Sequence, residues 1–109
     1  MQKNYVVPKM KEAFGELEFL GDIKELQRAT GTGRSRRNVT YALEYIFMSS
    51  KLKTNVEVIV PATVPRKVIP FEATIKKVIN PELRPEIRRG FNGPIAEVKL
   101  YVDDFEINQ

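Results

Sequence analysis

Alternating hydrophobic and polar residues mark two strands in the first half of the chain. Between Phe14 and Leu20, apolar side chains alternate with glutamates, which predicts a strand with one solvated face. Residues 38–48 are rich in β-branched and aromatic side chains and form the clearest predicted strand. One face of that strand carries Val39, Tyr41, Leu43, Tyr45 and Phe47. We expect both tyrosines to pack in the core or at its rim, unless this face is the open ligand surface of the fold.

Three later segments are also predicted to be strands. Residues 56–60 place valines on one face before a proline, and we expect them to pair antiparallel with the preceding strand. Residues 71–79 form a further strand. Residues 95–102 alternate, and the DDFEI segment after them completes or extends this last strand.

The connections between these strands are predicted to be irregular. Residues 21–37 contain too little apolar side chain for a packed element and indicate a long basic loop. The prolines in residues 61–70 exclude an uninterrupted helix and favour an extended crossing. Residues 80–90 open with Asn-Pro, which suits a helix start, but Pro85 limits any helix to a turn or two.

The strand count sets the fold class. Five or six strands in 109 residues predict an all-β protein with one domain over residues 1–109. We expect a small closed or partly open barrel, and the count best fits the five-stranded oligonucleotide-binding barrel.

Positive charge is concentrated in the middle of the chain. Residues 28–89 hold thirteen Lys or Arg against five Glu, an excess of eight, whereas the whole chain has a net charge of +4. This asymmetry suggests a polyanionic partner, and the alternative is a charge that serves only solubility.

The composition narrows the possible chemistry. The chain has no Cys and no His, so it lacks thiol nucleophiles, the usual general base and the commonest metal ligand. We therefore expect a protein that is not an enzyme, with no catalytic residues, no metal and no cofactor. The absence of Cys agrees with a cytoplasmic location. No apolar run approaches the roughly 18 residues of a membrane span, so we expect no membrane association.

Three segments carry a family resemblance. These are FGELEF at 14–19, VEVIVPATVPRKVIPFEATIKKVINP at 56–81 and YVDDFEI at 101–107. They resemble the YdcP-like family, a domain of unknown function carried by conjugative transposons and related integrative elements of Gram-positive bacteria. The resemblance implies a small oligonucleotide-binding-type barrel and an accessory role at single-stranded DNA, because the family includes a helicase-processivity factor for replication of its element.

The sharpest candidate binding cluster lies in the predicted basic loop. No acidic residue occurs from Leu26 through Leu43, and glycine, serine and threonine surround the arginines. Glycines let a backbone approach a phosphate, and the side chains can donate hydrogen bonds to its oxygens. The candidate phosphate ligands are Arg28, Arg34, Arg36 and Arg37. The alternative is a solvated loop without a ligand.

A second candidate cluster lies between the last two predicted strands. Phe91 follows three arginines, and a base can stack on its ring, although a loop aromatic also serves as a hydrophobic plug. Two lysines after residue 48 add charge to the proposed surface. The remaining candidate nucleic-acid ligands are therefore Lys51, Lys53, Arg84, Arg88, Arg89 and Phe91.

Two functions of different classes follow. The first is a non-enzymatic single-stranded DNA-binding accessory protein of a conjugative element, working beside a helicase in replication or transfer. The second is an adaptor that docks on a helicase, relaxase or transfer protein without contacting nucleic acid. Salt-sensitive binding to oligonucleotides distinguishes them.

Overall fold

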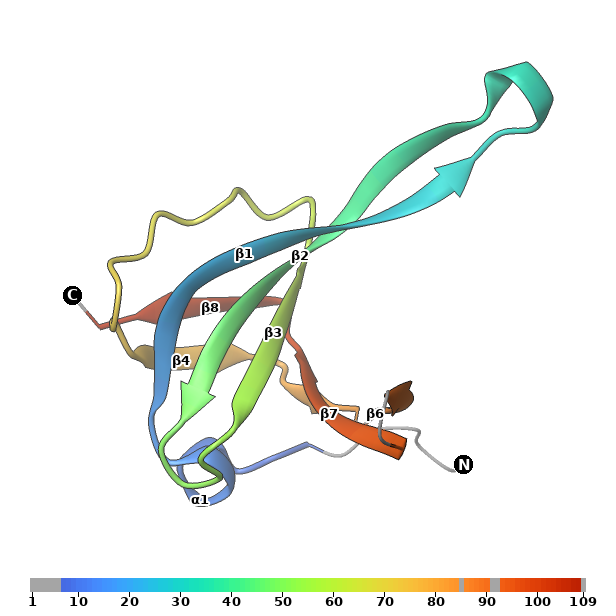
Figure 1. Cartoon of the computed structure of the whole chain (residues 1–109). Helices are drawn as coiled ribbons and strands as arrows, with labels where there is room; N and C mark the ends of the chain where they lie inside the picture. The colour runs from blue at the N-terminus through green and yellow to red at the C-terminus, as the bar shows by residue number, and fades with distance from the viewer. Residues whose placement is uncertain (1–6, 85, 91–92, 109) are drawn as a thin grey trace.

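The computed structural model describes residues 7–84, 86–90 and 93–108. Within these ranges the chain is dominated by β-strands, so the expected all-β class is confirmed. The elements are α1 (Met10–Phe14), β1 (Leu17–Thr30), the 3-10 turn η1 (Gly33–Ser35), β2 (Arg37–Ser49), β3 (Asn55–Pro61), β4 (Ile75–Ile79), β5 (Glu82–Leu83), β6 (Glu86–Gly90), β7 (Gly93–Tyr101) and β8 (Asp104–Ile107) (Figure 1).

These strands form two sheets. The larger has six strands in the order β1-β2-β3-β7-β5, and β6 also pairs with β7. β2 pairs antiparallel with both β1 and β3, which confirms the pair predicted from residues 38–60. β3 and β7 are parallel. The second sheet is the antiparallel pair of β4 and β8.

In the described residues, the two sheets join through short stretches of backbone contact. The amide of Val102 donates to the carbonyl of Ile59 at 3.0 Å where the chain passes from β7 towards β8. On the other side, an isolated bridge joins Glu18 of β1 to Thr74, beside β4. No closed barrel is found among the described strands. The sheets instead curve around a shared core (Figure 1).

The core lies between the two sheets. Side chains of β1, β2, β3, β7 and β8 meet there, and Phe105 packs edge-on against Tyr45 and Phe47 with ring centroids 5.1 and 5.8 Å apart. Edge-to-face pairs of this kind add to the stabilisation from apolar burial. The buried members of the core are Phe14, Leu17, Phe19, Leu43, Tyr45, Phe47, Val56, Val58, Val60, Leu100, Val102 and Phe105.

The first predicted strand begins later than the sequence suggested. Phe14 is the last residue of α1 and is buried, and Gly15 follows with a φ of 67° that ends the helix. β1 then starts at Leu17, which points into the core together with Phe19, while Glu18 between them is exposed. The alternation was therefore correctly interpreted from Leu17 onward.

The prediction of a long basic loop over residues 21–37 is wrong. β1 continues to Thr30, η1 turns the chain, and β2 starts at Arg37. Pairing with β2 provides the strand structure that the local sequence does not indicate, since the register continues to Thr30 opposite Arg37. The result is a long two-stranded hairpin that projects from the body of the protein (Figure 1).

The C-terminal part also differs from its prediction. Residues 80–90 hold the strands β5 and β6 and not a turn or two of helix, because both segments pair antiparallel with β7. The segment DDFEI does not extend β7. It forms β8, which leaves the larger sheet and pairs with β4.

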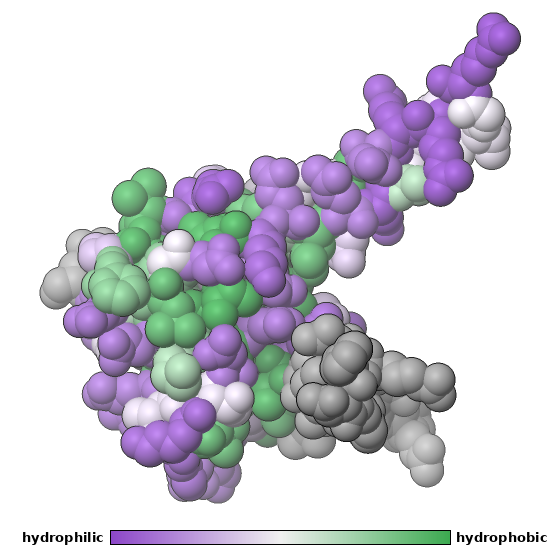
Figure 2. All heavy atoms as spheres, viewed as in Figure 1, coloured by the Kyte–Doolittle hydropathy of each residue, from purple (hydrophilic) through white to green (hydrophobic). Residues whose placement is uncertain are grey.

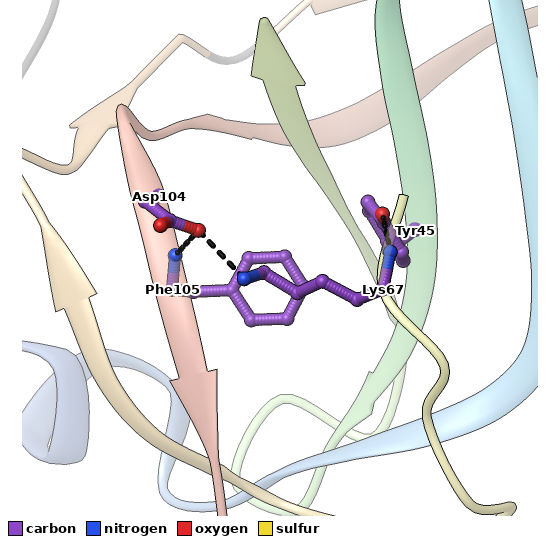
Figure 3. Close-up of polar contacts among 4 residues, drawn as sticks. All are labelled: Tyr45, Lys67, Asp104 and Phe105. Carbon is purple, nitrogen blue, oxygen red and sulfur yellow. Dashed lines mark hydrogen bonds and ion pairs between the residues drawn. The ribbon is translucent and has the colours of Figure 1, made fainter. Parts of the chain in front are cut away.

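The proline-rich crossing is extended, as expected, and an ion pair fixes it to the core (Figure 3). The Lys67 amide donates to the Tyr45 hydroxyl at 2.9 Å, and the Lys67 Nζ lies 2.8 Å from Asp104 Oδ1 and 5.1 Å from the Phe105 ring centroid. The hydrogen bond from Lys67, assisted by the Phe105 amide, holds the pKa of Asp104 below its usual range.

Candidate nucleic-acid interface

The hairpin formed by the end of β1 and the start of β2 stands away from the rest of the sheet. We call residues 27–40 the arm. Among the described strands, β3 pairs with β2 only from Ala42 onward, so β2 in the arm pairs with β1 alone. Figure 2 shows the arm as a predominantly hydrophilic projection.

The two faces of the arm differ in charge. Residues that pair directly across an antiparallel ribbon share a face, and the side chains alternate along each strand. Arg28 pairs with Val39 and Thr30 pairs with Arg37, so these four residues form the cationic face. The opposite face is uncharged and carries Gln27, Ala29, Asn38 and Thr40.

The tip adds two further arginines. Gly31 has a φ of 81°, a conformation that favours glycine, and it starts the turn that leads into η1. Arg34 and Arg36 are exposed there. Together with Thr30, Gly31, Ser35 and Arg37 they line an open hollow. The hollow is bordered by hydroxyl, amide and guanidinium donors and by no carboxylate, which is the donor set that a phosphate requires.

A β-bulge lies where the arm meets the body. Leu26 pairs with Ala42 but Gln27 pairs with Thr40, so Tyr41 is an extra residue in β2. Bulges re-aim side chains. Tyr41 therefore leaves the core-facing series of Leu43 and lies on the outer face, where it is 45% exposed and has the Arg28 guanidinium 5.7 Å from its ring centroid. The expectation that Tyr41 shares the face of Tyr45 is wrong.

Tyr41 lines a groove of about 360 Å³ on the outer face of the sheet. We call it the tyrosine groove. β2 and β3 contribute one side, and the connection around β5 together with the end of β7 contributes the other. Its lining is Tyr41, Ala42, Ile59, Pro61, Asn80, Glu82, Arg84, Tyr101, Val102 and Asp103.

The far wall of the tyrosine groove is built around Tyr101. The Arg84 guanidinium lies 4.4 Å from the Tyr101 ring centroid and forms an ion pair with Glu82. Asn80 Nδ2 donates to Asp103 Oδ2 at 2.7 Å. The carboxylates of Glu82 and Asp103 disfavour a phosphate on this wall, whereas the planar guanidinium and the ring offer a stacking surface.

The structure brings together only part of the sequence-predicted site. Arg28, Arg34, Arg36 and Arg37 share the arm, and Arg84 lies in the tyrosine groove that adjoins it. Lys51 and Lys53 lie in the turn between β2 and β3, beside α1 and at the opposite end of β2 from the arm (Figure 1). Lys51 donates there to the carbonyl of Glu12.

Three predicted ligands are not placed by the structure. Arg88 and Arg89 belong to β6, and their backbone pairs with Ile95 and Pro94 of β7, but their side chains lie outside the described part of the molecule. Phe91 is also outside the described residues. The stacking role of Phe91 stays a prediction.

Sequence reasoning did not assign two residues that line the groove, Tyr41 and Tyr101. The alternating pattern of β7 did place Tyr101 on the other face of the strand from Leu100 and Val102, both of which are buried. An aromatic residue on the solvated face of a terminal strand was therefore the available signal for Tyr101. No such signal existed for Tyr41, because its bulge depends on the cross-strand register.

Two other classes of feature are a metal centre and a membrane-spanning helix. Within residues 7–84, 86–90 and 93–108, no three His, Cys, Asp or Glu side chains gather closely enough to hold a metal ion. In the same ranges, no helix has the length and apolar character needed to cross a membrane.

Comparison with known proteins identifies one family. No curated protein and no solved structure matches the chain significantly. A family model described as bacterial protein of unknown function (DUF961) matches residues 4–105. Since this match covers almost the whole sequence, the chain belongs to the DUF961 family of bacterial proteins.

Proposed function

We propose that this protein is a non-enzymatic, single-stranded DNA-binding accessory protein. The observation that carries the proposal is the continuity between the cationic face of the arm and the tyrosine groove. Arg28 belongs to the first and contacts Tyr41 of the second. A cationic track beside aromatic stacking surfaces is the usual design of proteins that bind single strands without sequence preference.

The position of this surface in the fold supports the same function. In oligonucleotide-binding barrels, nucleic acid occupies the face of strands two and three and the loops that join strands one to two and four to five. Here the arm joins β1 to β2, and Ala42 and Ile59 of β2 and β3 line the groove. Asn80, which follows β4, and Glu82 of β5 lie on the far wall.

The arrangement suggests how a strand would lie. Phosphates follow the arm, where the side chains carry no negative charge, and bases enter the tyrosine groove. A base can stack on the exposed Tyr41 ring, next to the Arg28 guanidinium. Base-aromatic stacking contributes roughly 1–3 kcal/mol per base and tolerates any sequence, because every base has a π-face.

The biological setting of the proposal comes from the YdcP-like resemblance. We propose that the protein acts in the cytoplasm on the single-stranded DNA of a conjugative element, beside a helicase or relaxase, during replication or transfer. Three segments of the sequence, at 14–19, 56–81 and 101–107, support this assignment.

One observation favours a second function, that of an adaptor for a helicase, relaxase or transfer protein. Val68 and Phe71 are 97% and 66% exposed in the connection between β3 and β4. Exposed apolar side chains are a feature of protein docking sites where they form one contiguous patch. Under this alternative the basic arm serves solubility or an acidic protein surface.

A titration distinguishes the two functions. Fluorescence anisotropy of a labelled oligothymidine is measured with the intact protein over a range of salt concentrations. The proposal predicts saturable binding whose logarithmic affinity falls linearly with the logarithm of salt, by roughly 0.7 per phosphate contact. The adaptor alternative predicts no saturable binding at low salt, and that result would remove the proposed function.

A further inference from the structure

The arm has the form of a two-stranded ribbon that can reach beyond the groove. Within the arm, β2 extends four residues, 37–40, past its pairing with β3. At about 3.3 Å per residue, this segment spans roughly 13 Å. The major groove of B-form DNA is about 12 Å wide and 8.5 Å deep, and it admits a two-stranded β-ribbon. The arm is thus long enough to enter a duplex and still leave the tyrosine groove open.

From this geometry we propose that the preferred ligand is a junction between duplex and single-stranded DNA, with the duplex on the arm and the single strand in the tyrosine groove. This inference rests on the proposed function and names its substrate. It assigns different parts of the DNA to two surfaces that meet at Tyr41.

The chemistry of the cationic face suits a duplex groove. Arg28 and Arg37 can contact phosphates or guanine edges, and the 41% exposed Val39 on the same face offers an apolar contact for a thymine methyl group. The uncharged Gln27 and Asn38 face the other way.

The isolated arm also has an electrostatic reason to bind a polyanion. A two-stranded hairpin is marginally stable in water. In this one, Arg28 and Arg37 lie diagonally on the same face without a neighbouring carboxylate in residues 27–40. Like charges on one face of a ribbon repel each other. The phosphates of the two DNA backbones that border a groove would neutralise them.

The bulge at Tyr41 marks the position of the junction. The cationic face ends at the bulge, and the groove begins with the Tyr41 ring. A base at the end of the duplex can stack on this ring, while the strand that continues passes towards Tyr101. The same DNA strand thus contacts the arm on one side of Tyr41 and stacks in the tyrosine groove on the other.

The experiment compares three labelled DNAs at one salt concentration: a blunt duplex, an oligothymidine strand, and the same duplex with an oligothymidine tail. The tailed duplex should bind on the order of tenfold more tightly than either of its parts, as expected for a few added phosphate contacts. Equal affinity for the tailed duplex and the oligothymidine overturns the inference but leaves the proposed function intact. Equal affinity for the tailed and blunt duplexes also overturns it.

Two variants make the test specific to the arm. Shortening the arm, by replacing residues 29–38 with an Asn-Gly turn, should abolish the preference for the tailed duplex. Oligothymidine binding should weaken, because the phosphate contacts of the arm are lost, but should stay saturable through the tyrosine groove. The triple variant Arg34→Ala, Arg36→Ala, Arg37→Ala leaves the hairpin in place and should reduce the salt slope on the tailed duplex by about 2.7. The matched control removes three exposed lysines elsewhere on the body: Lys11→Ala, Lys76→Ala, Lys77→Ala.

The outcomes separate the two claims. If the control lowers the junction preference as much as the arm triple variant does, general charge explains the preference and the inference is wrong. If the intact protein binds none of the three DNAs, the proposed function itself is wrong, and the inference falls with it.

Discussion

Tyr41 and Tyr45 lie four residues apart on β2, yet their rings are on opposite faces of the sheet. The bulge at Tyr41 turns its ring outward, where it is 45% exposed, whereas Tyr45 is 1% exposed and packs against Phe105. The Tyr45 hydroxyl accepts a hydrogen bond from the Lys67 amide. One strand thus provides a stacking surface for a ligand and an anchor for the crossing segment.

Replacing Tyr41 by alanine should weaken oligothymidine binding without loss of stability. We expect a loss of about 1–3 kcal/mol in binding free energy, because one base-ring stack disappears. The melting temperature should change little, since the 45% exposed Tyr41 side chain lies outside the core. Anisotropy titrations and thermal unfolding monitored by circular dichroism measure the two quantities.

The matched variant Tyr41→Phe keeps the aromatic ring and should bind nearly as tightly as the unmodified protein. If Tyr41→Ala and Tyr41→Phe bind oligothymidine equally well, Tyr41 is not a stacking surface.

Removing the charges at the tip of the arm should change the salt dependence of binding. With Arg34, Arg36 and Arg37 replaced by alanine, the salt slope on single strands should fall by about 2, from roughly 0.7 per phosphate contact. A folded variant whose slope is unchanged would exclude the tip of the arm from the interface. Replacing Lys51 by glutamine, at the opposite end of β2, should leave the slope almost unchanged.

Tyr45→Phe should reduce stability and not binding. The substitution removes the acceptor of the 2.9 Å hydrogen bond from the Lys67 amide and keeps the ring in the core. The expected loss is about 1–2 kcal/mol in the free energy of unfolding, because a partly buried amide loses its partner. Urea unfolding measures it, and an unchanged unfolding midpoint would show that this bond does not hold the crossing segment.

The ion pair between Lys67 and Asp104 predicts a contribution to stability that depends on pH. Because the folded pKa of Asp104 is lowered, the pair stabilises the protein fully above the unfolded pKa of about 3.9 and less as pH falls through the folded pKa. Asp104 is 39% exposed, so we expect only about 0.5 kcal/mol at neutral pH.

The corresponding measurement compares urea midpoints of the unmodified protein and Asp104→Asn at neutral and acidic pH. The difference between the two proteins should shrink as Asp104 becomes protonated. A difference that stays constant down to strongly acidic pH would contradict the assigned role of the carboxylate.

The sequence revealed the strands that bury one face. Leu43, Tyr45 and Phe47 in β2, and the valines of β3, alternate because the core requires apolar side chains at every second position. The arm was missed for the converse reason: both faces of a free-standing ribbon contact solvent, so residues 27–40 carry no apolar period. β5 and β6 were missed because pairing with β7 overrides local turn signals.

Only the positive charge of the candidate site could be predicted from the sequence. The arginines of the arm were identified because acids are absent around them, a property of composition that needs no structure. The tyrosine groove, by contrast, combines residues from β2, β3, β5 and β7 with residues in the connections that follow β4, β5 and β7. Their proximity follows from the parallel pairing of β3 with β7, which depends on contacts distant in sequence.

The most direct measurement of the central claim maps the DNA-binding surface residue by residue. Backbone amide signals of the isotope-labelled protein are followed by nuclear magnetic resonance during titration with oligothymidine. The proposal predicts that the largest shifts occur in the arm and around Tyr41, Ile59, Arg84 and Tyr101, while α1, β4 and β8 stay unchanged. Saturable binding with shifts confined to α1, β4 and β8, or no shifts at all, would contradict it.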